Sequence, residues 1–108
     1  MRKPLLHCFV NTADGVGTVK FAGELDMASA PDAEHALTRA LTSGCHRIVV
    51  DLRDLEFMDS SGLTLLARWE LGSRDDGYDL ALIPGQAPIQ RLFAISGLDR
   101  QFSFEEPG

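Results

Sequence analysis

The residues best suited to chemistry are two adjacent serines, Ser60 and Ser61, which stand between Asp59 and Gly62. An unbroken, largely β-branched apolar run precedes them, and apolar residues at helical spacing follow. The serines therefore lie where a loop leaving a strand enters a helix, beside unpaired backbone N–H groups and the positive end of the helix dipole. A hydroxyl in this position is suited to carry a phosphate that another molecule is able to detect.

Two elements must position these serines. The run from Arg47 to Leu52 predicts a central strand that is apolar on both faces and covered on both. A loop through Asp54 and Phe57 then leads to the serines. The helix is expected from about Ser61 to Ser73, because its apolar residues recur at three- and four-residue intervals, and Asp75-Asp76-Gly77 ends it.

Four further strands are predicted. Cys8 to Val10 and Thr18 to Ala22 are expected to pair as a hairpin, because Asp14-Gly15 between them is typical of a tight turn. Leu80 to Ile83 reads as a buried strand. Phe102 and Phe104 alternate with polar residues, which predicts a last short strand.

Two further helices complete the prediction. Ser29 is the expected N-cap of the first, with Pro31 just inside it and Gly44 at its end. Pro88 opens the last helix, and Gly97 ends it. The order β-β-α-β-α-β-α-β predicts an α/β fold in which a mixed sheet is packed with helices.

Composition limits the possible functions. With 108 residues, one domain spanning 1–108 is expected. The net charge of −6 argues against binding to nucleic acid or to an anionic membrane surface. No apolar stretch is long enough for a membrane span or a signal peptide, so a cytoplasmic location is expected. Neither the two cysteines nor the three histidines have the spacing of a metal site, so no metal is expected.

Several segments together resemble the STAS domain family, which is named after sulphate transporters and anti-sigma factor antagonists. The resemblance covers roughly residues 8 to 104. It rests on Val49-Val50-Asp51-Leu52 followed by Phe57-Met58-Asp59-Ser60-Ser61-Gly62-Leu63, on the upstream Gly23-Glu24-Leu25-Asp26, and on Arg91-Leu92-Phe93 followed by Ser96-Gly97-Leu98.

This resemblance implies a switch controlled by phosphorylation. An antagonist of this family binds an anti-sigma factor, which is itself a serine kinase, and so releases a sigma factor. The kinase holds Mg-ATP and phosphorylates the serine that follows the aspartate, which corresponds to Ser60, and a serine phosphatase reverses the step. The chain itself is then expected to be no enzyme and to need no cofactor. The resemblance assigns the partner surface to Asp26, Glu24, Asp59, Ser61 and Gly62.

The residues leave structural alternatives open. Ser60 and Ser61 are also good N-caps, and Asp26 is able to cap the turn before the first helix. We further expect the helix start to tolerate a phosphate on Ser60 through its free N–H groups, and Gly62 to let a partner approach closely.

Other functions are disfavoured by the motifs. A serine hydrolase lacks its Gly-x-Ser-x-Gly elbow, and a nucleotide-binding module lacks its Gly-x-x-x-x-Gly-Lys loop. The stronger alternative is a non-switching STAS subunit of a stress-signalling scaffold or of a lipid-transport complex. A monomer or weak dimer is expected, and no further C-terminal helix of the kind that family members often carry is readable.

Overall fold

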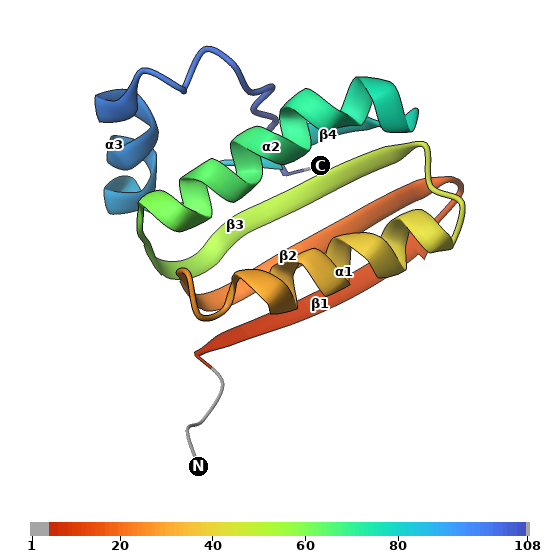
Figure 1. Cartoon of the computed structure of the whole chain (residues 1–108), viewed down its shortest axis with the longest axis horizontal. Coiled ribbons are helices and arrows are strands. Elements are labelled where there is room, and N and C mark those ends of the chain that lie inside the picture. Colours follow the sequence, from red (N-terminus) through yellow and green to blue (C-terminus); the bar gives the residue numbers. More distant parts are fainter. Residues whose placement is uncertain (1–4, 108) are drawn as a thin grey trace.

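A computed structural model describes residues 5–107 of the chain. Within this range the elements follow the order β-β-α-β-α-β-α (Figure 1). The strands are β1 (Leu6–Ala13), β2 (Val16–Leu25), β3 (Arg47–Met58) and β4 (Asp79–Ile83), and the helices are α1 (Ala30–Thr42), α2 (Ser60–Asp76) and α3 (Ala87–Ser96). They form the predicted α/β domain, of which residues 1–4 and 108 lie outside the described part.

The strands lie side by side in one mixed sheet, in the order β1-β2-β3-β4. β1 and β2 are antiparallel, whereas β2, β3 and β4 are mutually parallel. The predicted hairpin is confirmed: Asp14 (φ 53°) and Gly15 (φ 78°) both have the positive φ that a two-residue turn of type I′ requires. Ala13 pairs with Val16 directly across this turn.

Both long helices pack on the same face of the sheet (Figure 1). α1 lies over β1 and β2, and α2 lies over β3 and β4. Side chains that alternate along the strands point toward these helices and form the core together with the apolar faces of α1 and α2. The fully buried members include Val19, Phe21, Ile48, Val50, Leu52, Leu82, Ala33, Ala40, Leu65 and Leu66.

Neither α1 nor α2 covers the opposite face of the sheet. In β1 this face carries His7, Phe9 and Asn11, which are all exposed, and 57% of the Phe9 surface is open to solvent. Val49 of β3 is half-buried there. The expectation that the central strand is covered on both faces is therefore wrong at this position, because the second long helix packs on the same face as the first.

β3 is longer than predicted. It continues from Leu52 through Met58, so the loop expected around Asp54 and Phe57 is part of the strand. The pairing with β2 shifts register twice in this stretch. Each shift changes which side chains face the core, so Leu55 and Met58 are buried although they do not follow the two-residue alternation. The exposed polar residues Arg53, Asp54 and Glu56 made the segment look like a loop.

The last predicted strand is reduced to one bridge. Phe104 pairs with Leu82 of β4, and no regular strand forms around it. Phe102 and Phe104 instead pack edge-to-face on Phe93 of α3, with ring centroids 5.3 and 5.2 Å from it. Aromatic packing onto α3, rather than a strand ladder, therefore places this segment.

Candidate functional site

Asp59 forms the junction between β3 and α2 and places the two serines. Its backbone is extended, and its Oδ1 accepts hydrogen bonds from the N–H groups of Ser61 (2.9 Å) and Gly62 (3.2 Å). Asp59 is thus the N-cap of α2, and Ser60 and Ser61 are its first two helical residues. The interpretation of the serines as N-caps is wrong, because the preceding carboxylate has that role.

The hydroxyl of Ser60 is available for chemistry. Ser60 is exposed and Ser61 half-buried, and within residues 5–107 neither hydroxyl forms a hydrogen bond. A shallow groove of about 310 Å³ runs beside them between the start of α1 and the first turns of α2. It is lined by Met27, Ala30, Ser60, Ser61, Thr64, Leu65 and Arg68.

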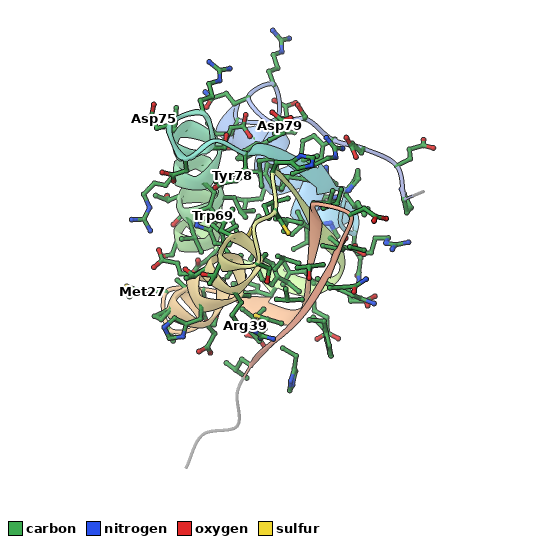
Figure 2. The ribbon with its side chains drawn as sticks, turned by 90° about the vertical axis from the view of Figure 1, so that its right-hand side faces the viewer. Met27, Arg39, Trp69, Asp75, Tyr78 and Asp79 are labelled. Atoms are coloured by element: carbon green, nitrogen blue, oxygen red, sulfur yellow. The ribbon has the colours of Figure 1, made fainter. Side chains whose placement is uncertain are left out.

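Sequence reasoning missed the other five residues of this groove, among them Thr64, Arg68 and Met27. Thr64 and Arg68 follow Ser60 at four-residue intervals, so all three lie on one face of α2. That spacing is the signal that was available to find them. Met27, which is 76% exposed in the turn before α1, gave no such signal, because nothing in the sequence shows where this turn lies relative to α2. It is labelled at the margin of the molecule in Figure 2.

Asp26 reaches the same end of the sheet as Ser60. The N–H of Asp59 donates to the carbonyl of Leu25 (3.3 Å), so Asp26 and Ser60 both leave the sheet at this end. Asp26 also shapes the turn: its Oδ1 accepts from the N–H of Ser29 (3.0 Å), and its own N–H donates to Ser29 Oγ (2.9 Å). The structural alternative for Asp26 is confirmed.

Ser29 occupies the N-cap position of α1, as predicted. Its side chain makes no capping bond to α1. The buried hydroxyl instead donates to the carbonyl of Glu24 (2.9 Å) and accepts from Asp26. Ser29 therefore holds the turn that carries Asp26 rather than the first turn of the helix. The expected proline near the start of α1 is present.

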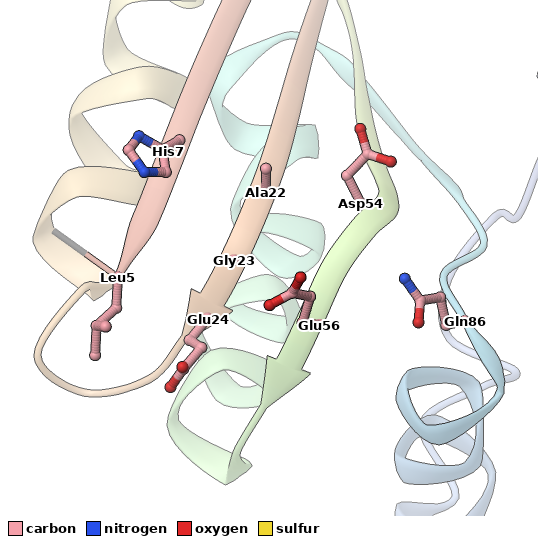
Figure 3. A pocket seen from close by; sticks show the side chains of 8 residues that line it. All are labelled: Leu5, His7, Ala22, Gly23, Glu24, Asp54, Glu56 and Gln86. Carbon is pink, nitrogen blue, oxygen red and sulfur yellow. The ribbon is translucent and has the colours of Figure 1, made fainter.

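Glu24 lies apart from the groove. Its side chain lines a separate hollow together with Asp54, Glu56 and His7, as Figure 3 shows. Asp54 is paired there with Lys20 at 2.7 Å. The lining of this hollow includes neither serine. Asp59 thus adjoins Ser60 and Asp26 lies at the same end of the sheet, whereas the carboxylate of Glu24 faces the separate hollow.

Gly62 faces the interior, so the expectation that it lets a partner approach closely is wrong. A Cβ there would lie 2.7 Å from Met58 Cγ, 2.9 Å from Leu25 Cγ and 3.0 Å from the carbonyl oxygen of Leu25. The glycine lets the first turn of α2 pack closely on the ends of β2 and β3.

The helix start also offers fewer free N–H groups to a phosphate than expected. The N–H groups of Ser61 and Gly62 are already bound by Asp59, so they are not free to receive a phosphate. The nearest guanidinium in the groove, that of Arg68, is held 3.0 Å from Glu34 of α1. A phosphate on Ser60 would therefore add its charge beside a carboxylate that already occupies the helix N-terminus.

Trp69 is not part of the exposed site. It is 7% exposed and packs against Phe21, with the ring centroids 6.2 Å apart (Figure 2). Trp69 is therefore a core residue and not a partner-facing anchor. Phe57, at 47% exposure, is the large apolar side chain that remains open near the end of β3.

The fold and the Asp-Ser-Ser-Gly helix start place this chain in the STAS domain family. The family model described as "Mlab, STAS domain" matches residues 8–105. An anti-sigma-B factor antagonist from Staphylococcus aureus is 33% identical over 93 residues, which are 86% of each chain.

Solved structures agree with this membership. An anti-sigma factor antagonist from Mycobacterium paratuberculosis aligns over 95% of this chain and 86% of its own, with 28% identity and a TM-score of 0.77. The Bacillus cell fate determinant SpoIIAA in its phosphorylated form aligns over 92% of this chain and 91% of its own, with 19% identity and a TM-score of 0.68. Across residues 5–107, no helix has both the length and the apolar character needed to cross a membrane.

Proposed function

We propose that this chain is an anti-sigma factor antagonist whose binding is switched by phosphorylation of Ser60. The unphosphorylated form binds an anti-sigma factor that is also a serine kinase, and binding frees the sigma factor. The observation that carries the proposal is the exposed Ser60 hydroxyl, which has no hydrogen-bond partner within the described residues and lies at the rim of a groove. The names of the relatives support the antagonist function.

The charges around Ser60 explain how a phosphate ends binding. A phosphate adds about 1.5 to 2 negative charges at pH 7 and three acceptor oxygens. Asp59 already bonds the N–H groups of Ser61 and Gly62, so the phosphate finds neither of these two donors vacant. It would remain a desolvated dianion beside a carboxylate in any tight interface. A penalty of about 3–4 kcal/mol is enough to weaken binding several-hundred-fold, since about 1.4 kcal/mol is a factor of ten.

The division of labour follows from this proposal. The kinase partner holds Mg-ATP and supplies the catalytic groups, so the chain needs no cofactor and is no enzyme. A serine phosphatase restores the free hydroxyl. Asp26, Ser61, Thr64 and Met27 border the surface that the kinase contacts. We place the protein in the cytoplasm, where sigma factors act.

Phosphorylation is tested with the chain and each anti-sigma-type kinase of its own genome in the presence of Mg-ATP. Intact-mass and peptide mass spectrometry should find one added phosphate on Ser60. Ser61→Ala is the matched control, because it removes the neighbouring hydroxyl of the same helix turn and should still gain the phosphate. Ser60→Ala should bind the kinase and gain none. A phosphate on Ser61 instead would contradict the assignment.

Binding is tested with Ser60→Asp, which should fold normally and bind the kinase weakly. Circular dichroism separates loss of binding from loss of structure. If no kinase of this type modifies or binds the chain, the alternative of a non-switching STAS subunit of a scaffold or lipid-transport complex is favoured. Capture of such subunits by the wild type, with equal affinity for Ser60→Asp, would identify that function.

A further inference from the structure

The two edges of the sheet differ. The outer edge of β4 is covered, because Leu82 donates to the carbonyl of Ser103 and accepts from the N–H of Glu105, both at 2.8 Å. β1 forms the other edge. Within residues 5–107 no backbone group binds its outer side. An open edge is a template for another strand unless the protein protects it.

β1 carries none of the usual protections. Its eight residues, LHCFVNTA, contain no lysine, acid or proline, and its register with β2 is uninterrupted by a bulge. The two-residue turn makes Ala13 and Val16 a hydrogen-bonded pair, and such pairs alternate along an antiparallel ladder. The backbone groups that point outward are therefore those of Leu6, Cys8, Val10 and Thr12.

We infer that this edge binds β1 of a second copy of the chain, antiparallel and centred on Phe9. In this register Leu6 faces Thr12 and Cys8 faces Val10 of the second copy. All outward-pointing groups of both strands are then paired, whereas shifting the centre by one residue leaves one end unpaired. Phe9 meets Phe9 of the second copy directly across the two-fold axis, which covers a side chain that is 57% exposed in the monomer.

Opposite charges on the two α1 helices face each other across the same two-fold axis. The backbone carbonyl of Asp32 lies 3.8 Å from the Cys8 thiol, and Arg39 lines a groove with Val10 and Thr12 (Figure 2 labels Arg39 beside β1). Because Cys8 faces Val10 of the second copy, Asp32 of each copy is level with Arg39 of the other. Both side chains are exposed, and neither forms an ion pair within the described part of the chain.

This pairing does not depend on the proposed function. The groove beside Ser60 lies between α1 and α2, where Glu34 and Arg68 join the two helices. Asp32 and Arg39 lie on the side of α1 that faces the β1 edge. Both Ser60 sites therefore stay open in the pair.

Cross-linking tests the register. Phe9→Cys places two thiols in a non-hydrogen-bonded pair, about 4.5 Å apart at Cα, which a disulfide is able to span. Oxidation should give a covalent dimer, and peptide mass spectrometry should locate the link between the two introduced thiols, apart from any link through Cys8 or Cys45. Asn11→Cys is the matched control on the same strand and face. It faces His7 of the second copy and should not cross-link to itself. Equal cross-linking of both variants would overturn the register.

Sedimentation equilibrium tests the pairing itself. The wild type should shift from 11.8 kDa toward twice this mass as concentration rises. Phe9→Lys puts like charges directly opposite each other and should weaken the dimer at least tenfold. Ile95→Lys makes the same change at a 77% exposed residue of α3 and should leave the dimer unchanged. A wild type that stays monomeric at several hundred micromolar, or a Phe9→Lys dimer of undiminished affinity, would overturn the inference.

Discussion

Replacement of Gly62 by alanine tests how the start of α2 is packed. In an open helical position this change stabilises a protein by about 0.8–1.0 kcal/mol, because alanine is the better helix former. At Gly62 the new methyl group would lie within 3.0 Å of Met58 Cγ, Leu25 Cγ and the Leu25 carbonyl oxygen. The carbonyl is the least able to move, because it accepts the N–H of Asp59 and so joins β2 to the start of α2.

Overpacking of this kind costs about 1–3 kcal/mol. After the gain in helix propensity is subtracted, we expect Gly62→Ala to lower the free energy of unfolding by up to about 2 kcal/mol. In a domain of this size each kcal/mol lowers Tm by about 4–8 °C. Urea unfolding followed by circular dichroism gives the free energy of unfolding, and a thermal scan gives Tm.

Gly72→Ala provides the matched control in the same helix. Among residues 5–107, a Cβ there would contact Asp76 Oδ2 alone, at 3.7 Å, which is ordinary van der Waals distance. This variant should gain about 0.5–1 kcal/mol, so the two substitutions should have opposite signs. If Gly62→Ala were as stable as Gly72→Ala, the reasoning that close packing requires the glycine would be wrong.

Substitutions at three further positions test contacts at the start of α2, in the turn before α1 and within β3. Asp59→Ala should cost about 1 kcal/mol in urea unfolding, while Asp59→Asn should retain most of the stability, because asparagine also caps helices. Ser29→Ala should cost about 1–3 kcal/mol, since the buried hydroxyl both donates and accepts in the turn before α1. Hydrogen bonds from Arg53 hold the pKa of Asp51 below its usual value, against the effect of burial. Their contribution is present above the unfolded-state pKa and is lost as pH falls through the folded-state pKa. Arg53→Met should therefore raise the pKa of Asp51, which an NMR titration measures, and move acid unfolding to higher pH.

Local patterns predicted most of the fold correctly. The Asp14-Gly15 turn, the apolar stripe of α1 and the glycine that ends α3 each depend on neighbouring residues, which is why they could be read directly. The far end of β3 could not be read in this way. Its burial pattern depends on register shifts against β2, a strand more than twenty residues away in the chain.

The candidate site was predicted only in part, because some of its features depend on adjacent residues and others on tertiary contacts. The serines and the helix start follow from adjacent residues. The cap was assigned to the wrong side chain, because aspartate and serine are about equally good N-caps and stand next to each other. The inward direction of Gly62 and the place of Met27 depend on how α2 meets the end of β2, which is a tertiary contact.

The segment over the edge of β4 also sets a limit on assembly. Residues 103–105 take up the backbone groups of Leu82, and Arg47 binds Glu105. A sheet with one unpaired edge pairs with one further copy and then stops, whereas a sheet with two unpaired edges adds copies without limit and forms a filament. This short aromatic segment therefore prevents further copies from pairing at β4. If this segment detached from Phe93, each copy would have two sheet edges available for pairing in place of one. The copies would then form a polymer instead of a dimer.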